Sequence, residues 1–489
     1  MSTLLKLTVD RAESHSLSEQ IRRGIARAIE DGVLEPGARL PSWQDLAVQL
    51  GVARGTVRTA YEKLAAAQLI EASGAAGTRV ADRPRSGSRR GTSPTAGSFI
   101  ETYLEMTQGP ALFQMGVPAS HAMPSKLLAR LRASAVRAEL SASPLYPDPR
   151  GELELRREIA AYLAVARGIN CSASQVIITG GFAGGFGMTL NVLGLHGHSA
   201  WFEDPGFPWT RRALELAHVL PVPVPVDGEG LNVDHGTRNY PEAKLAVLTP
   251  GQQAPLGTTL SLQRRLQLLE WAERSGAWIV EDDYLSELQL SGRAAPALAS
   301  IDNGGRVIHI GSFSKTISPA LRLGFVIAPA ELAGRFAEVA ACLSPPPGPS
   351  VQLAISEFIR EGHYMRHLRR IKRAYAAARQ PVLDYFRDAL GPDSVSAPGL
   401  SVLLKLPKGA PDVAIARDAL TFGTFPASLS PWYASAEMAE AGLLLGVATA
   451  PIKNVVRTCE RLIETITRCS EGAAKSSYST LLQCRADPD

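Results

Sequence analysis

One lysine, Lys315, stands where a covalent bond to a carbonyl compound could form. It follows the apolar run 306–310 (RVIHI), which is typical of a buried strand, and two hydroxyls, Ser312 and Ser314, precede it. Arg322 follows a short loop later. A lysine amine can form a Schiff base, while hydroxyls and a guanidinium can bind a phosphate. Pyridoxal 5'-phosphate (PLP) requires both functions, although an ordinary surface loop can contain the same residues.

A second strand end has the other groups that this cofactor needs. Residues 278–284 (WIVEDDY) form a short apolar run that ends in three acids and a tyrosine. The cofactor requires a carboxylate against its pyridine nitrogen and a hydroxyl on its phenolic oxygen. Asp282 and Tyr284 suit these roles because alternate residues of a strand point the same way. Spacing alone leaves Glu281 and Asp283 open as the carboxylate, and a solvated acidic strand end is the ordinary alternative.

These residues require a scaffold that brings several strand ends together. Between residues 150 and 330, apolar runs alternate with helix-like stretches, which indicates an α/β domain with a mostly parallel sheet. The candidate residues lie at the ends of such runs or in the following loops, where α/β sheets bind ligands. The expected strands are 176–178, 200–202, 245–248, 278–280 and 307–310.

A helical stretch after residue 335 leads into a smaller α+β segment and is rich in basic residues. These are His363, His367, Arg369, Arg370, Lys372 and Arg373. A solvated helix face is the default interpretation, with a dimer contact or a DNA-facing patch as alternatives. The two histidines lie four residues apart, but no third ligand is evident, so we expect no metal site.

The order and spacing of several motifs resemble the aminotransferase-like domain of fold-type I PLP proteins. In particular, they resemble the MocR/GabR group of bacterial transcriptional regulators. The resemblance covers roughly residues 113–470. It is carried by YPDPRG at 146–151, VIITGG at 176–181, EDPGFP at 203–208, TPGQQAPLG at 249–257, EDDYLSE at 281–287, SFSK at 312–315 and LRLG at 321–324.

This resemblance implies a role for each matching residue. Lys315 would hold the cofactor covalently, Asp282 would face the pyridine nitrogen and Tyr284 the ring oxygen. Arg322 would hold the phosphate, and Phe207 would stack on the ring. The remaining cofactor-binding candidates are Ser312, Ser314 and the loop residues Gly181, Phe182 and Ala183.

Four positions depart from the family pattern. Ala183 and Gly184 stand where two glutamines are common, so backbone N–H groups alone would bind phosphate there. Trp209 replaces an arginine of GabR-like proteins, and Leu444 replaces the arginine that binds a substrate α-carboxylate in aminotransferases. Losing such a charged pair, worth about 1.5–3 kcal/mol, weakens amino-acid binding by roughly ten- to a hundredfold. We therefore expect a poor or inactive aminotransferase.

The first 80 residues carry an independent signal. A capping box at 16–19 (SLSE) predicts the start of a helix that Gly32 stops. Two further helices, at 42–50 and about 54–67, are joined by a glycine turn, as in a helix-turn-helix. Residues 70–80, with two glycines, predict a β-hairpin wing. One face of the first helix is apolar through Leu17, Ile21, Ile25 and Ile29.

This pattern resembles the GntR-type winged helix, although a small helical packing domain is the alternative. The resemblance is carried by LPS at 40–42, LA at 46–47, GV at 51–52, TV at 56–57 and AY at 60–61. A recognition helix presents the side chains near its start to DNA. The DNA-binding candidates are therefore Arg54, Gly55, Thr56 and Arg58, with Gln44 in the second helix and Gly77 in the wing. Gln44 stands where the family usually carries arginine, so its contact would be neutral.

These signals predict a multidomain protein. An α+β winged helix-turn-helix (1–82) and a flexible linker (83–112) precede an α/β fold-type I aminotransferase-like domain (113–475). That domain has a smaller C-terminal α+β subdomain, and a tail (476–489) follows. The net charge of +4 over 489 residues is modest. Without an 18-residue apolar run or a signal-peptide pattern, and with five scattered cysteines, we expect a cytoplasmic protein.

We expect a PLP-dependent, DNA-binding transcriptional regulator that senses a small amine or amino-acid effector. A homodimer would present two winged helices to paired half-sites of an operator. Two other functions stay open. One is a sensor of PLP itself that controls vitamin B6 supply without an amine effector. The other is an active aminotransferase with a vestigial DNA-binding domain.

Overall fold

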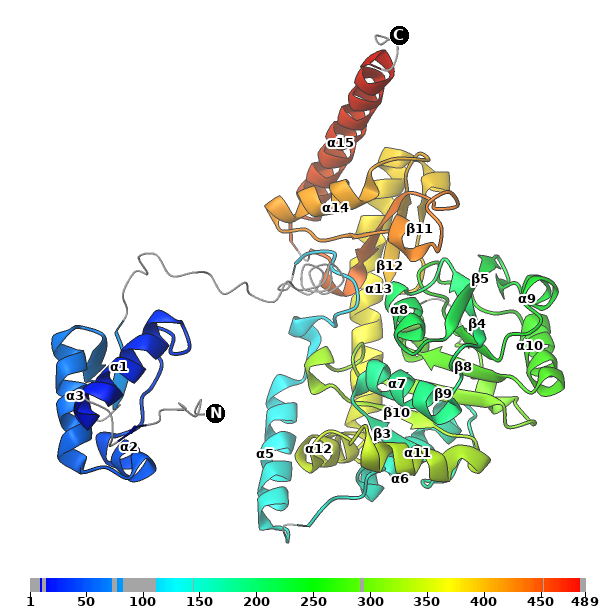
Figure 1. Ribbon diagram of the computed structural model, residues 1–489. Coiled ribbons are helices and arrows are strands. Elements are labelled where there is room, and N and C mark those ends of the chain that lie inside the picture. Colours follow the sequence, from blue (N-terminus) through cyan, green and yellow to red (C-terminus); the bar gives the residue numbers. More distant parts are fainter. Residues whose placement is uncertain are drawn as a thin grey trace. The chain divides into compact units, whose positions relative to one another are not determined.

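The computed structural model describes residues 9–10, 15–72, 77–81, 111–143, 145–290, 294–451 and 453–483. The chain forms two compact units, Met1–Gln108 and Gly109–Asp489 (Figure 1). Residues 83–110 of the expected linker lie outside the described residues. No helix in the described ranges is long and apolar enough to cross a membrane.

The first unit contains three helices and a two-stranded antiparallel hairpin. Ser16 caps the first helix by accepting from Glu19 N at 3.4 Å, and Ser42 caps the second by accepting from Asp45 N at 3.1 Å. These caps and the left-handed Gly51 after the second helix confirm the predicted boundaries. The elements are α1 Leu17–Glu30, α2 Trp43–Leu50, α3 Arg54–Ala66, β1 Ile70–Ala72 and β2 Thr78–Val80. Their shared apolar core includes Ile21, Ile25, Leu46, Val57, Leu64 and Val80.

An eight-stranded sheet forms the centre of the second unit, in the order β3-β10-β9-β8-β7-β4-β5-β6. Strands β4, β5, β7, β8 and β9 are mutually parallel, as predicted, whereas β10 is antiparallel to both β3 and β9. The carboxyl ends of β3, β4, β8 and β9 therefore lie at one edge. The strands are β3 Val176–Thr179, β4 Ser199–Asp204, β5 Leu220–Asp227, β6 Gly230–Leu231, β7 Leu245–Leu248, β8 Trp278–Asp283, β9 Val307–Ser312 and β10 Gly324–Ile327.

Helices cover both faces of this sheet, as a parallel sheet requires. Ile177, Ile308 and Val326 pack on one face with Phe186 of α7 and Phe336 of α11. On the other face, Ile279 and Val307 join an apolar cluster with residues of α9 and α10. The helices here are α6 Leu153–Ala166, α7 Gly181–Leu193, α8 Pro208–Leu216, α9 Val233–Asn239, α10 Leu262–Ser275 and α11 Ala333–Cys342.

A smaller four-stranded antiparallel sheet follows along the chain, in the order β11-β12-β14-β13. Its strands are β11 Val395–Ser396, β12 Ser401–Lys405, β13 Ala427–Ser428 and β14 Gly442–Gly446. The other helices are α5 Ser125–Ser141, α12 Pro349–Arg360, α13 His363–Leu390, α14 Asp412–Ala419 and α15 Val455–Gln483. The last helix extends past residue 476, where we expected a tail, and residues 484–489 lie outside the described ranges.

The solvated-face interpretation is wrong for one side of α13. His367 is only 3% exposed, and its Nε2 donates to Thr316 O at 2.7 Å. Tyr364 donates to Thr316 Oγ1 at 3.2 Å, and Arg370 donates to Ala122 O. Tyr364 and His367 point inward and fix α13 to Thr316, the residue after Lys315, while Arg369, Arg370 and Arg373 are exposed. Sequence patterning missed this because the partners lie far away along the chain.

Candidate cofactor site and DNA interface

Lys315 lies in the turn after β9, and its amine contacts the segment with which the second unit begins. Nζ donates to Gly116 O at 2.8 Å. Gly116 has a φ of +79°, and a Cβ there would lie 2.9 Å from Nζ, so glycine permits this close approach. Burial lowers the pKa of Lys315, and the charge of Asp282 opposes that shift. A lowered pKa increases the neutral, nucleophilic fraction of the amine.

The three acids at the end of β8 have different partners. Asp282 is the one that interacts with Lys315: burial and the nearby Asp283 raise the pKa of Asp282, and the lysine opposes the rise. Glu281 instead accepts from Leu298 N at 2.7 Å and from Ala299 N at 3.0 Å. Strand alternation therefore directs Asp282 to the lysine side and its two neighbours to the opposite side.

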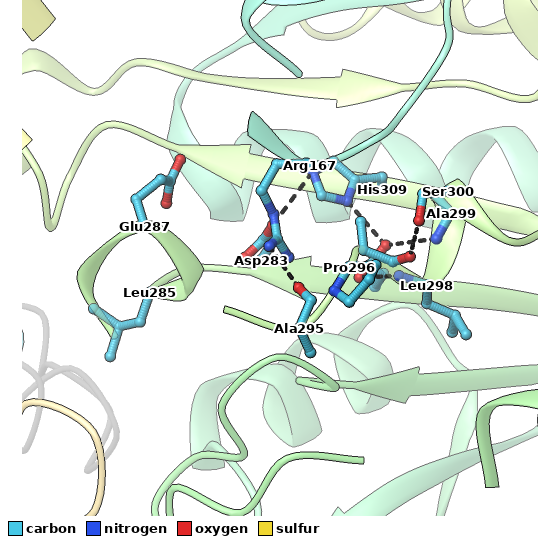
Figure 2. A network of polar contacts seen from close by, with 12 residues as sticks. Arg167, Asp283, Leu285, Glu287, Ala295, Pro296, Leu298, Ala299, Ser300 and His309 are labelled. Atoms are coloured by element: carbon cyan, nitrogen blue, oxygen red, sulfur yellow. Dashed lines mark hydrogen bonds and ion pairs between the residues drawn. The ribbon is translucent and has the colours of Figure 1, made fainter. Parts of the chain in front are cut away.

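The neighbours of Asp282 on β8 belong to a buried network of four charged side chains, of which Figure 2 labels Arg167, Asp283 and His309. Arg167 Nε donates to Asp283 Oδ2 at 2.8 Å, and His309 Nδ1 lies 3.0 Å from Glu281 Oε2. His309 Nε2 lies 3.8 Å from Asp283 Oδ2, and all four side chains are at most 3% exposed. Burial lowers the pKa of the His309 ring, but the neighbouring Glu281 more than offsets this, so the pKa of His309 is raised. The network joins α6, β8 and β9 beneath the candidate site.

Residues from three strand ends form a cradle for an anion. A Cβ on Gly181 would lie 4.0 Å from both Ser314 Oγ and the carbonyl carbon of Arg322. Ser312 Oγ donates to Ser314 Oγ at 2.9 Å and accepts from Ser314 N at 3.1 Å. Gly181 begins α7, which has no side-chain cap, and a helix N-terminus favours an anion. The other predicted loop residues, Phe182 and Ala183, lie in the first turn of this helix.

Tyr284 and Phe207 pack on a buried apolar cluster that sequence reasoning did not predict. This cluster, called the apolar wall, consists of Ala254, Leu403, Leu429, Trp432 and Leu444. The ring of Phe207 lies 5.7 Å from that of Trp432. The wall combines residues of the large sheet's loops with residues of β12 and β14, so no local pattern could have revealed it.

Glu203, at the end of β4, is a buried carboxyl that we did not single out from the sequence. Its Oε2 accepts from Thr249 N at 3.1 Å and from Thr249 Oγ1 at 2.7 Å. Burial raises the pKa of Glu203 to about 8. Its charge in turn raises the pKa values of Asp282 and Tyr284. The only signal in the sequence was its place at the start of the EDPGFP motif.

In the first unit, the predicted DNA-binding residues lie at the start of α3, away from the core. Arg54, Gly55 and Arg58 are exposed, Thr56 is half-buried, and Val57 faces the core. Gln44 is exposed in the first turn of α2, and Gly77 precedes β2 with a φ of +87°. The exposed Arg58 also pairs with Glu62, with Nε and Oε1 2.9 Å apart.

Two basic residues at the base of the wing escaped the sequence analysis. Arg39 and Arg79 form an isolated antiparallel bridge, and both are exposed. Arg79 Nη1 donates to Gly37 O at 2.8 Å. The Arg39 guanidinium lies beside Gly77, about where a Cβ would stand. Their positive charges add to the surface that carries the predicted DNA-binding residues.

Comparisons with known proteins match both units. Residues 118–403 match aminotransferase class I and II, and residues 17–80 match the bacterial regulatory proteins of the gntR family, which implies DNA binding. A probable rhizopine catabolism regulatory protein, MocR, from Rhizobium meliloti is 35% identical over 76% of this chain and 77% of its own. The pyridoxine biosynthesis transcriptional regulator PdxR from Corynebacterium glutamicum is 32% identical over 76% and 78%, respectively.

Solved aminotransferases share the fold of the second unit. The α-aminoadipate aminotransferase LysN from Thermus thermophilus, complexed with N-(5'-phosphopyridoxyl)-L-leucine, is 26% identical with a TM-score of 0.66. The match covers 75% of this chain and 95% of the LysN chain. An archaeal alanine:glyoxylate aminotransferase, 24% identical, has a TM-score of 0.67 and covers 76% and 94%. The class I and II match implies PLP as the cofactor, and the cradle, the acid and the half-buried lysine fit it.

The buried network generates a prediction about stability. We expect Arg167→Leu to lower the free energy of unfolding by about 3–5 kcal/mol, because it leaves Asp283 buried without its partner. The matched control is Arg212→Leu, since Arg212 and Glu215 form an ion pair whose side chains are 46% and 40% exposed. Removing such a surface pair costs about 0–1 kcal/mol. Urea denaturation of both variants checks this, and equal losses would contradict it.

Glu203 generates a prediction about pH. Between about pH 4.5 and 8, native Glu203 keeps a proton that the unfolded chain releases. Its contribution to the free energy of unfolding is complete below that window and falls by about 1.4 kcal/mol per pH unit across it. Glu203→Gln cannot titrate, so the stability of wild type relative to this variant declines as pH rises. Denaturation of both proteins at several pH values tests this, and parallel curves would refute it.

Proposed function

We propose that this chain, which belongs to the MocR type of GntR-family transcriptional regulators with an aminotransferase class I and II domain, controls transcription in response to a small amine at Lys315. The observation that carries the proposal is the convergence at one sheet edge of a half-buried lysine, its acid Asp282 and an anion cradle. The exposed start of α3, the expected recognition helix on the same chain, supports a role in controlling transcription.

PLP would be held by residues that already lie together. Gly181, Ser314 and Arg322 would bind the phosphate, with Ser312 positioning the Ser314 hydroxyl. Asp282 would face the ring nitrogen and hold a proton there, while Tyr284 would donate to the ring oxygen. Phe207 would stack on the ring, as the motif resemblance implies. When bound, PLP supplies an aldehyde that condenses reversibly with one amine at a time and releases water.

Lys315 is the group through which a ligand amine would act on the protein. The same Nζ that donates to Gly116 would attach the cofactor, and attachment would leave it at most one N–H to donate. A ligand amine that takes the place of the lysine would free Nζ to hold Gly116 again. A ligand shifts a conformational equilibrium only by binding one arrangement better than the other, and this exchange creates that difference.

The segment 111–123 would carry this change toward the winged helix. It is the first described part of the chain after the expected linker. Phe113 N donates to Thr449 O at 3.2 Å, and Ala119 N donates to Tyr375 Oη at 3.0 Å. Lys315 is thus one of several attachments of a segment whose other end leads to the DNA-binding unit.

A homodimer would present two winged helices to paired half-sites. Three apolar side chains near the end of α5 support a protein contact there, namely Leu140, Leu145 and Tyr146, which are 80%, 82% and 102% exposed. A regulator that acts on bacterial operators works in the cytoplasm, where we place this protein.

A second candidate is that PLP itself is the signal. The similarity to PdxR, a pyridoxine biosynthesis transcriptional regulator, favours it, as does the leucine at position 444. This candidate differs in one outcome: DNA affinity would change when PLP is added or removed, and amines would have no effect. An active aminotransferase is disfavoured because Leu444 cannot pair with a carboxylate.

Lys315→Ala tests the cofactor assignment. We expect PLP-treated wild-type protein to show a visible absorption band of the lysine-bound cofactor, and the variant to lose it because no amine remains at that position. Lys405→Ala, which removes an exposed lysine on β12, is the control and keeps the band. A band that persists unchanged in Lys315→Ala would show that another group holds the cofactor.

Gly116→Ala tests the proposed path. Its Cβ would stand 2.9 Å from Lys315 Nζ, which pushes the amine away from the carbonyl of residue 116. The control Gly409→Ala has nearly the same φ, +80° against +79°, with nothing within 4 Å of its Cβ. Hydrogen exchange of residues 111–123 should differ several-fold between PLP-free and PLP-loaded wild type. Gly116→Ala should abolish that difference and Gly409→Ala should retain it; the reverse result would exclude this path.

A further inference from the structure

We propose that the ligand of this site is a primary amine with an apolar body and no carboxylate. This inference rests on the proposed role of Lys315 and goes beyond it by defining the chemical class of the ligand. Three features of the site carry it: the apolar wall, a second apolar surface beyond Phe207, and the distribution of charge.

The apolar wall lies next to the groups that would act on an amine. Tyr284 packs on the wall. Besides burial, the charge of Asp282, the acid that interacts with Lys315, raises the pKa of Tyr284, so the two side chains lie near each other. Leu444 is fully buried in β14, where it pairs with Leu403 of β12 and Ala427 of β13. Every side chain that defines this wall is apolar apart from the indole N–H of Trp432. A ligand held by its amine would therefore direct the rest of its body toward hydrocarbon and aromatic surface.

A second apolar surface continues beyond Phe207. The Phe207 ring stacks on Trp209, with centroids 5.8 Å apart and planes 7° from parallel, and lies 5.7 Å from Trp432 of the wall. Trp209 and Phe207 also line a cavity of about 440 Å³ between α7 and α8. Phe182 and Phe186, stacked at 5.5 Å, line the same cavity. Phe207 thus joins the apolar wall to a cavity with space for an apolar group.

The polar groups near the wall can accept hydrogen bonds from an amine and offer a carboxylate no cation of their own. Asp282 and Glu203 bring two carboxyl groups to the site, and each affects the pKa of Tyr284. The guanidinium of Arg211 lies beside Tyr433, which packs on the wall: Nη1 donates to Tyr433 O at 2.8 Å. Its charge also acts on Asp204. None of the five side chains that define the wall is cationic, so a ligand carboxylate buried against them would find no charged partner among them, which is unfavourable.

A pair of compounds that differ only by a carboxylate tests the inference. Full-length, PLP-loaded protein is titrated with phenethylamine and with L-phenylalanine, and the shift of the visible band is followed. The same titrations with free PLP correct for the intrinsic reactivity of each compound. We expect phenethylamine to act at a concentration at least about tenfold lower, since an unpaired buried charge costs at least that factor in affinity. Ethanolamine, a polar amine, should be at least as weak as phenylalanine.

Two variants examine the wall directly. Leu444→Arg should shift the preference toward phenylalanine by roughly ten- to a hundredfold, because a guanidinium then pairs with the carboxylate. Leu444→Met keeps the wall apolar and should retain the wild-type preference. If Leu444→Arg does not fold, the wild-type comparison still decides the matter.

Each other outcome overturns a distinct claim. Phenylalanine acting as well as phenethylamine would overturn the absence of a carboxylate from the ligand, and ethanolamine acting as well would overturn its apolar body. A visible band that no amine shifts would overturn the ligand class while leaving attachment of PLP to Lys315 intact. No band after addition of PLP would overturn the proposed function itself, and this inference with it.

Discussion

The buried network of Arg167, Asp283, His309 and Glu281 is the constraint on which the candidate site depends. Burying four charges is costly and is tolerated only when each is paired. Pairing Glu281 with His309 and Asp283 with Arg167 commits two of the three adjacent acids of β8 to the face away from the lysine. Asp282, between them, must therefore face Lys315. The network therefore orients Asp282, although Asp282 is not one of its four members.

The site itself combines segments that are far apart in the sequence. Its cradle comes from the loop after β3 and the turn after β9, and its acid comes from β8. The parallel topology brings these ends to one edge, where open α/β sheets bind ligands. The segment 111–123 then contacts the lysine from the start of the unit. Cofactor chemistry and the path toward the DNA-binding unit would thus share one amine.

Polar and apolar groups lie in separate parts of the site, and this separation determines which ligand the site can bind. Two carboxyl groups and one lysine lie together, and beside them stands a wall of leucine, alanine and aromatic side chains. Glu203 belongs to this arrangement because its protonated form avoids a second buried negative charge near Asp282. The motif resemblance places the carboxylate-binding arginine of aminotransferases where Leu444 lies. Its replacement by a packed leucine is consistent with a binding protein that recognises an amine.

The sequence by itself determined the elements and most of the candidate residues, because caps, apolar periodicity and strand-end motifs depend on neighbours a few residues away. Ser42, the loop that carries Lys315 and five strands of the large sheet (β3, β4, β7, β8 and β9) could be predicted in this way. Tertiary structure alone decided which acid of β8 faces the lysine, that His367 points inward to Thr316, and that Leu444 and Trp432 meet Phe207. Those outcomes depend on partners tens to hundreds of residues away, and local sequence patterns contain no information about such contacts.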